Sequence, residues 1–213
     1  MNMIKNYIIL VLASVSFGMM AFAKHADATE SSQVAELGKP APDFTLTDIY
    51  GNDVTLSSFE GQKVVLEWTN HKCPFVIKHY EPGNMQNIQR RVIEEENGAW
   101  LTIISSAEGK QGYVTADEAK EVLAGYGYEP TAKLFDTSGD VGRAYGAQTT
   151  PHMYIIDEEG TLVYRGAIDD NSSHRSETIE GALNYVVAAL DDMNAGNAIT
   201  HADTRPYGCS VKY

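Results

Sequence analysis

The sequence predicts an α/β domain in which a central mixed β-sheet is flanked by helices. Short segments that are apolar throughout, or that alternate apolar and polar residues, recur along the chain and are typical of strands. Longer segments with apolar residues at helical spacing lie between them. Two short strands around a Glu158-Glu159-Gly160 turn, followed by one last helix, complete the pattern.

The first predicted element is a β-hairpin. Residues 44–47 and 54–56 alternate apolar and polar side chains, and Gly51-Asn52 lies between them as a turn. The next element is a strand at residues 64–68. Its short, mostly apolar run suits a strand that is buried on both faces.

A helical region is predicted over residues 74–96. Pro82-Gly83 must interrupt it, because proline lacks a backbone N–H and clashes with the preceding turn. A second helix over 115–123 has a possible capping box, since Thr115 stands three residues before Glu118. The remaining predicted elements are strands at 101–104, 134–135, 153–156 and 162–164, and helices at 141–145 and 178–193.

The first 23 residues are predicted to be a secretory signal peptide. Lys5 gives a basic start, residues 7–21 are apolar or small, and Ala21-Phe22-Ala23 is a small-x-small cleavage site. An uncleaved membrane anchor is the alternative, and the apolar run is short for one. The resulting division is a signal peptide at 1–23, a flexible polar leader at 24–37, a folded domain at 38–193 and a C-terminal tail at 194–213.

Composition and this N-terminus restrict the partners of the protein. A cleaved signal peptide implies an exported protein, periplasmic or secreted, without stable membrane insertion after cleavage. The formal net charge of −13 makes nucleic acid an unsuitable partner, because an anionic body repels phosphate backbones. Exported compartments are oxidising, so the two cysteines of the chain can form a disulfide there.

Cys73 is the candidate reactive sulfur. It directly follows the strand at 64–68 and directly precedes Pro74, a residue favoured at the first helical position. Unpaired backbone N–H groups and the helix dipole stabilise a thiolate at that point, and Lys72 and His71 would add positive potential. The alternative is a buried, inert cysteine.

Several motifs resemble those of the redoxins, the alkyl hydroperoxide reductase/thiol-specific antioxidant family within the thioredoxin-like superfamily. Residues 38–48 with 56–59 resemble its N-terminal signature, and residues 68–75 (WTNHKCPF) its active-site turn. Residues 136–146 resemble its downstream helix. Thr150-Pro151-His152 resembles the cis-proline loop that faces the active sulfur. The match runs from about 38 to 192, and the tail at 207–213 resembles the end of a peroxiredoxin-like subgroup.

The resemblance implies a thioredoxin-like fold with an N-terminal β-hairpin and an inserted strand–helix. It implies that Cys73 attacks a substrate and that Pro151 is cis, which leaves the backbone of Thr150 free to pair with a substrate chain. Val76 stands where thioredoxins have their second cysteine, so dithiol exchange within one turn is excluded. Asn70 stands where typical peroxiredoxins hold the peroxide with Thr or Ser, and its amide can donate and accept hydrogen bonds.

Further candidate residues come from the chemistry of their side chains. The guanidinium of Arg143 suits a thiolate or a peroxide oxygen, although a plain surface arginine is an equal alternative. His71, His79 and His152 could form a metal site with the cysteines, but no tight ligand spacing supports one. We therefore expect neither a metal nor another cofactor.

These observations favour a thiol-dependent oxidoreductase with an antioxidant role. The substrate would be a peroxide or a protein disulfide or dithiol, with Cys73 as the attacking sulfur and Cys209 as a possible resolving thiol, and a reducing partner protein would complete the cycle. Cys209 lies near the chain end after Gly208, in a tail expected to be irregular and mobile. Two alternatives remain: a metal-handling or binding protein of the same fold, and a redox-silent scaffold with a structural Cys73–Cys209 disulfide.

Overall fold

The computed structural model describes residues 34–127 and 130–213, so the predicted signal peptide and most of the predicted leader lie outside the described residues. The packed chain begins by Ala35, three residues before the predicted start of the domain at residue 38. Ala35 is buried and donates its backbone N–H to the Ala144 carbonyl at 2.9 Å. Over the described stretches, no helix has the length and apolar character needed to cross a membrane.

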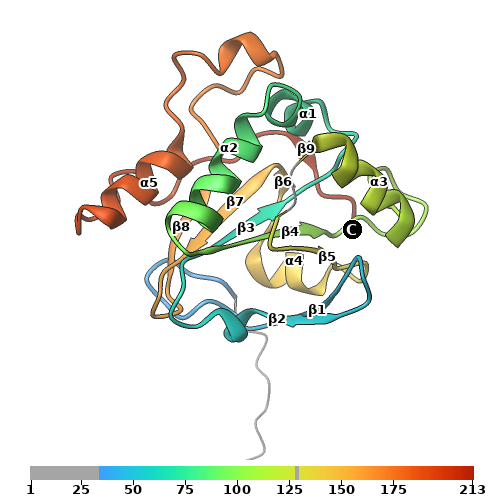
Figure 1. Ribbon diagram of the computed structural model, residues 1–213, viewed down its shortest axis with the longest axis horizontal. Helices are drawn as coiled ribbons and strands as arrows, with labels where there is room; N and C mark the ends of the chain where they lie inside the picture. The colour runs from blue at the N-terminus through green and yellow to red at the C-terminus, as the bar shows by residue number, and fades with distance from the viewer. Residues whose placement is uncertain (1–33, 128–129) are drawn as a thin grey trace, which may run out of the picture. The chain divides into compact units, whose positions relative to one another are not determined.

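A seven-stranded mixed sheet forms the centre of the described chain, as predicted (Figure 1). Its order is β2-β1-β5-β4-β3-β7-β8, with parallel pairing of β3 to β4 and of β4 to β5 and antiparallel pairing elsewhere. The strands are β1 (Thr45–Asp48), β2 (Asp53–Thr55), β3 (Val64–Trp68), β4 (Ala99–Ile104), β5 (Ala132–Phe135), β7 (His152–Ile156) and β8 (Leu162–Gly166). The predicted N-terminal hairpin is β1–β2, which pairs Thr45 with Thr55.

The helices cover both faces of this sheet. They are α1 (Pro74–Tyr80), α2 (Asn84–Arg90) with a π-helical extension at Arg91–Glu95, α3 (Ala116–Tyr126), α4 (Asp140–Tyr145) and α5 (Tyr185–Asn194). Short 3-10 turns lie at Leu56–Phe59 and Ser176–Thr178. Gly83, with φ +80°, separates α1 from α2, and the predicted capping box of Thr115 and Glu118 starts α3.

Alternate residues of β3 face opposite layers of the fold, as expected of a strand. Leu66 and Trp68 pack in a cluster with residues of α4 and of the N-terminal segment. Val65 packs in a second cluster with residues of α1, α2 and α5. In Figure 1, α4 accordingly lies on one side of the sheet and α1 and α2 on the other. The strand that leads to Cys73 is thus buried on both faces, as predicted.

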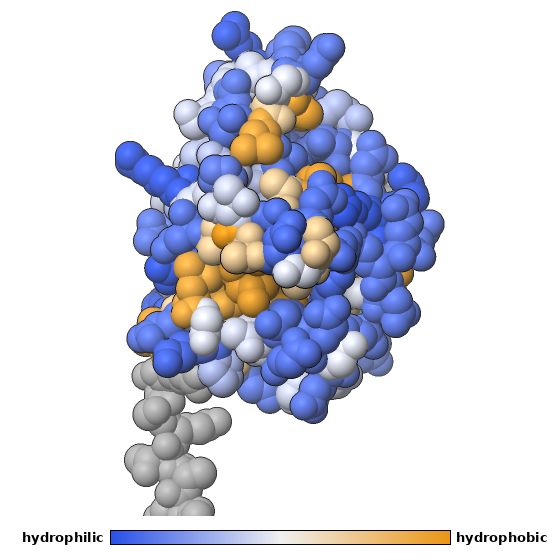
Figure 2. Space-filling model, turned by 90° about the vertical axis from the view of Figure 1, so that its left-hand side faces the viewer, coloured by the Kyte–Doolittle hydropathy of each residue, from blue (hydrophilic) through white to orange (hydrophobic). Residues whose placement is uncertain are grey.

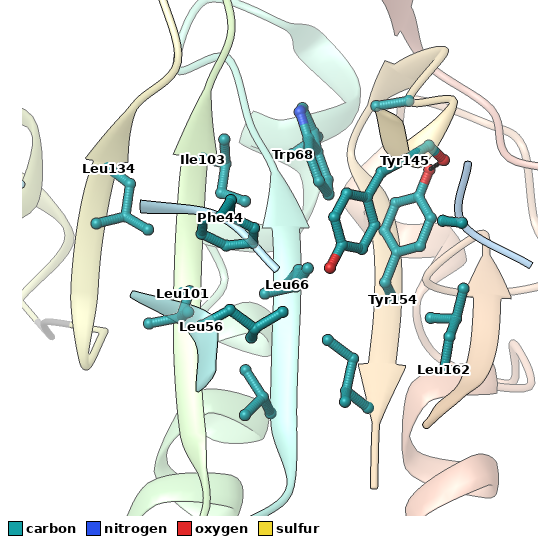
Figure 3. Packing of buried hydrophobic residues seen from close by; sticks show 14 of the residues in the cluster. Phe44, Leu56, Leu66, Trp68, Leu101, Ile103, Leu134, Tyr145, Tyr154 and Leu162 are labelled. Carbon is teal, nitrogen blue, oxygen red and sulfur yellow. Dashed lines mark hydrogen bonds between the residues drawn. The ribbon is translucent and has the colours of Figure 1, made fainter. Parts of the chain in front are cut away.

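An aromatic cluster fixes the end of β3 (Figure 3). The Trp68 ring lies 5.3 Å from the Tyr145 ring and 5.0 Å from the Tyr154 ring, between centroids. The Trp68 indole N–H donates to Ser105 Oγ at 2.9 Å, and that hydroxyl donates to the Asp136 carboxylate at 2.6 Å. The turn that carries Cys73 therefore leaves from a strand end held by both ring packing and hydrogen bonds.

The surface is more polar than the interior. Figure 2 shows a side on which hydrophilic residues cover most of the molecule and hydrophobic residues gather in a patch. Large apolar side chains that are exposed include Val34, Tyr50 and Leu183. Single exposed apolar residues of this kind are usual on folded proteins and carry no argument about function.

The last helix begins later than predicted. The sequence predicts a helix over 178–193, whereas α5 starts at Tyr185. Gly181 has φ +83°, a left-handed conformation that ends the preceding turn. Asn184 then caps the new helix by accepting the backbone N–H of Val187 at 3.0 Å. The capping bond and the glycine turn outweigh the helical spacing of Ile179 and Leu183.

The predicted irregular tail is packed against the domain. It contains a short strand β9 (Cys209–Ser210) that pairs antiparallel with β6 (Thr149–Thr150). Directly after β9, Val211 donates its N–H to the Gln148 carbonyl at 3.0 Å, and Ala107 donates to the Lys212 carbonyl at 2.9 Å. Backbone pairing of this kind needs no periodic side-chain pattern, so the sequence carried no signal for it.

Replacement of the α5 cap tests the corrected helix start. Asn184→Ala removes the acceptor for the Val187 N–H and should lower the free energy of unfolding by about 1 kcal/mol. Asn184→Asp keeps an acceptor oxygen and is the matched control. Chemical denaturation of both variants measures the difference, and an equal loss in the two would contradict capping by this side chain.

Candidate active site

Cys73 lies where the sequence predicts, at the start of α1. It is the N-cap residue, with φ −81° and ψ 123°, and Pro74 takes the first helical position. Its backbone N–H donates to the Asn70 carbonyl at 2.9 Å, which closes the turn after β3. The side chain is fully buried, and its Sγ donates to the Thr150 carbonyl oxygen at 3.1 Å. The sulfur therefore faces the loop that contains Pro151.

The Thr150–Pro151 peptide bond is cis, as the resemblance implied. The preceding residues form β6, and the register of its pairing with β9 sets Thr150 opposite Cys209 and Thr149 opposite Ser210. Thr150 Oγ1 also donates to the Cys209 carbonyl at 3.4 Å. The loop that faces Cys73 is thus also the backbone partner of Cys209.

The two cysteines meet at this loop. Both are free thiols, and Cys209 is partly exposed. Burial raises the pKa of the Cys209 thiol, and a hydrogen bond and charge interaction with Cys73 raise it further, against a smaller opposing effect of Lys212. The raised pKa keeps the Cys209 thiol protonated at neutral pH, and the interaction with Cys73 indicates that the two side chains lie close together.

Asn70 shapes the turn that carries Cys73. Its side chain is buried, accepts the backbone N–H of Lys72 at 2.9 Å and donates to the Gln111 carbonyl at 3.3 Å. Any side chain at Gly112 would collide with it, because a Cβ there would lie 2.5 Å from the Asn70 amide carbon. These contacts make Asn70 a residue that positions the turn, and its role toward a peroxide stays a prediction.

Arg143 points to other partners. Its guanidinium donates to the Ser138 carbonyl at 2.7 Å, lies 3.7 Å from the Asp140 carboxylate and stacks 4.6 Å from the Tyr213 ring centroid. The guanidinium therefore contacts Tyr213, the C-terminal residue, and none of these contacts involves the Cys73 sulfur. The plain surface reading of Arg143 fits them better than a role at the thiolate.

His71 does not add the positive charge suggested by the sequence, and His152 is uncharged as well. Burial lowers the pKa of His71, and the nearby Lys72 and Lys133 lower it further. Burial lowers the pKa of His152 to about 3, and its Nδ1 accepts the Gln148 N–H at 3.3 Å. In the part of the chain that the structure describes, no three or more His, Cys, Asp and Glu side chains are arranged to hold a metal ion.

A buried carboxyl on β3, the strand that leads to Cys73, was missed from the sequence. Glu67 on β3 is fully buried and accepts hydrogen bonds from the Tyr80 hydroxyl at 2.8 Å and the Trp100 indole N–H at 3.0 Å. Burial raises the pKa of Glu67 and lowers that of nearby Lys133 to about 8. The sequence feature that could have revealed this buried carboxyl is the single glutamate inside an otherwise apolar strand, VVLEW.

A second buried polar cluster joins α1 to the tail. Lys78 Nζ lies 3.0 Å from the Asp169 carboxylate, and the Tyr207 hydroxyl donates to the same carboxylate. His79 Nε2 lies 3.3 Å from the Tyr207 hydroxyl, and its Nδ1 faces the Asn84 amide at 2.8 Å. We call these four residues, Lys78, His79, Asp169 and Tyr207, the latch. Its members are far apart in sequence, so no local pattern could have revealed it.

A model of the AhpC/TSA family matches residues 37–165. That segment contains the Cys73 turn and the cis-proline loop and is more than half of the 213-residue chain. The chain belongs to the AhpC/TSA family. The family resemblance drawn from the motifs is confirmed over this segment, and the resemblance of the tail at 207–213 to a subgroup stays a prediction.

Individual relatives agree with this assignment. The chain is 26% identical over 157 residues to the thiol-disulfide oxidoreductase ResA of Bacillus cereus, over 73% of this chain and 82% of the relative. It is 25% identical over 172 residues to the thiol:disulfide interchange protein DsbE of Vibrio cholerae, over 80% and 86%. A crystal structure of a hypothetical protein from Sinorhizobium meliloti 1021 matches with a TM-score of 0.69 at 26% identity, over 85% and 96%. The fold is thioredoxin-like, and the two named relatives, ResA and DsbE, are proteins of thiol–disulfide exchange.

The burial of His79 in the latch predicts that acid destabilises the folded protein. Burial lowers the pKa of His79 from 6.5 to about 4, although Asp169 raises it and Lys78 lowers it. At pH values between about 4 and 6.5, His79 is protonated in the unfolded chain but not in the folded protein. Acidification through this range therefore favours unfolding. From pH 7 to pH 5, wild type should lose about 1–2 kcal/mol more unfolding free energy than His79→Gln.

Urea unfolding at both pH values measures this difference. Glutamine keeps a donor and an acceptor at the site but takes up no proton, so every other titrating group is common to the two proteins. Equal losses in wild type and variant would show that His79 is not held neutral by the fold.

Proposed function

We propose that this protein is an exported thiol oxidoreductase that uses Cys73 and Cys209 as a redox pair. The observation that carries the proposal is the pairing of Cys209 with Thr150, whose carbonyl accepts the Cys73 thiol at 3.1 Å. This arrangement supports a direct reaction between the two sulfurs, because a disulfide needs Cα atoms within roughly 7 Å.

Cys73 is the attacking sulfur in this proposal. Cys73 is the N-cap residue of α1 and directly faces the cis-proline loop, where the active sulfur of a thiol oxidoreductase is expected. Cys209 has a raised pKa and is the sulfur that keeps its proton. The different environments of the two residues therefore support an attacking and a resolving role, respectively.

Two substrate classes lead to the same product. With a hydroperoxide, Cys73 attacks the O–O bond, retains one oxygen as sulfenic acid and releases an alcohol or water. With a disulfide, Cys73 attacks one sulfur, forms a mixed disulfide and releases the other as a thiolate. Cys209 then attacks the Cys73 sulfur, so that water or the second substrate thiol leaves and a Cys73–Cys209 disulfide forms. A dithiol partner protein must reduce that bond to complete the cycle.

Export is the part of the proposal that rests on sequence alone. The segment at 1–23 has the basic start, apolar run and small-x-small site of a signal peptide. An oxidising compartment would suit a protein that cycles through a disulfide. The predicted cleavage leaves Lys24 as the first residue, a result that the intact mass of exported protein can check.

Removal of the resolving thiol tests the proposed pair. After treatment with one equivalent of hydrogen peroxide, Cys209→Ser should accumulate sulfenic acid on Cys73, because no second sulfur can displace it. Wild type should instead give a disulfide within one chain. Dimedone labelling followed by peptide mass spectrometry distinguishes these products.

Cys73→Ser is the matched control and should give neither product. If wild type and Cys209→Ser yield the same disulfide-free oxidation product, then Cys209 is not the resolving residue. If Cys73 stays reduced in both proteins while a peptide disulfide also leaves it unmodified, the proposed function itself is wrong.

A further inference from the structure

We propose that the segment Tyr207–Val211 determines which substrates reach Cys73. It occupies the strand edge that an extended polypeptide would need, so the enzyme with a docked tail prefers small hydroperoxides to polypeptide disulfides. This inference rests on the proposed function and names the substrate class of the same site. Below, the docked tail means the state in which β9 pairs with β6.

The tail takes up the backbone groups beside the reactive sulfur. β9 pairs antiparallel with β6, and Val211 extends the contact to Gln148 through its N–H. An extended peptide that binds a strand edge uses these same main-chain donors and acceptors. The tail and a polypeptide substrate therefore exclude each other at Thr149–Thr150.

The fit of the tail to this edge depends on a glycine. Gly208 has φ +135°, a backbone conformation that residues with a side chain rarely adopt. A Cβ at this position would lie 2.1 Å from the Thr150 carbonyl oxygen, a separation that no native contact reaches. Residue 208 can follow this path beside the cis-proline loop only because it lacks a side chain.

The latch fixes the N-terminal end of the segment through Tyr207, the residue before Gly208. The Tyr207 hydroxyl donates to Asp169 and lies 3.3 Å from Lys78 Nζ, and its ring packs edge-on against Phe75 at 5.8 Å. At the chain end, the Tyr213 hydroxyl donates to the Ala147 carbonyl at 2.8 Å. The segment that covers the site is thus fixed on both sides by a tyrosine.

The consequence differs between the two kinds of substrate. Cys73 is fully buried with the tail docked, so either substrate needs some opening. A hydroperoxide needs room for two oxygen atoms, whereas a polypeptide needs the whole β6 edge. Only molecules with an undocked tail can bind the polypeptide. Its apparent affinity is therefore the intrinsic affinity multiplied by the fraction of molecules in that state.

Gly208→Ala tests this proposal. The added methyl group collides with a backbone atom, so it should displace β9 while leaving the seven-stranded sheet, which does not include β9, intact. The two probes are hydrogen peroxide and a synthetic pair of extended peptides joined by one disulfide. Single-turnover modification of Cys73 by each probe gives the ratio of the peptide rate to the peroxide rate.

We expect that ratio to rise about tenfold in Gly208→Ala, a change that corresponds to about 1.4 kcal/mol in the docking equilibrium. Tyr207→Phe keeps the ring but removes the hydroxyl from the latch, and it should raise the ratio in the same direction. Tyr145→Phe is the matched control: it loses a buried hydroxyl bond to the Pro42 carbonyl, 2.7 Å long, in which no residue of the tail takes part. Its ratio should stay at the wild-type value.

The outcomes separate this inference from the proposed function. If Cys73 reacts with both probes but the ratio is unchanged in Gly208→Ala and in Tyr207→Phe, the tail does not set specificity, whereas the proposed redox pair survives. If wild-type Cys73 reacts with neither probe, the proposed function itself is wrong, and the inference about the tail is wrong with it. Should Gly208→Ala not fold, the Tyr207→Phe ratio alone decides, with thermal unfolding as the check on its fold.

Discussion

The backbone of Thr150 is the constraint on which the site depends. Its carbonyl accepts the Cys73 thiol, its strand pairs with Cys209, and its close approach requires a glycine at 208. One residue thereby positions both sulfurs without a Cys-x-x-Cys turn. A second thiol that is distant in sequence reaches the active-site loop because β9 pairs with β6 and sets Cys209 opposite Thr150.

The buried Lys78–Asp169 ion pair contributes more to the position of the tail than to the net stability of the fold. Lys78 and Asp169 are almost completely buried, and the desolvation of two such ions offsets much of their attraction. Removing one partner would leave an unpaired buried charge and destabilise the protein by about 3–5 kcal/mol. Because the Tyr207 hydroxyl shares the Asp169 carboxylate, the tail is docked in one register. The pair therefore contributes specificity of position.

Local signals in the sequence predicted the fold and the first half of the site. The Cys73-Pro74 pair at a strand end, the break at Pro82-Gly83 and the hairpin each depend on neighbouring residues, and the structure has all three. The start of α5 was wrong because a capping bond and a glycine turn overrode helical spacing. The tail strand, the latch and the hydrogen bonds of the buried Glu67 depend on contacts between segments that are not neighbours in sequence. Single-sequence patterns contain no information on such contacts.

The central claim is that Cys73 and Cys209 form one reversible redox couple within the chain. Equilibration of the wild-type protein with mixtures of reduced and oxidised dithiothreitol, followed by acid quenching and peptide mass spectrometry, tests it most directly. The account predicts a two-electron transition between two free thiols and an intramolecular Cys73–Cys209 disulfide, reversible in both directions. Disulfides formed only between chains, or a bond that persists at potentials well below about −300 mV, would contradict it.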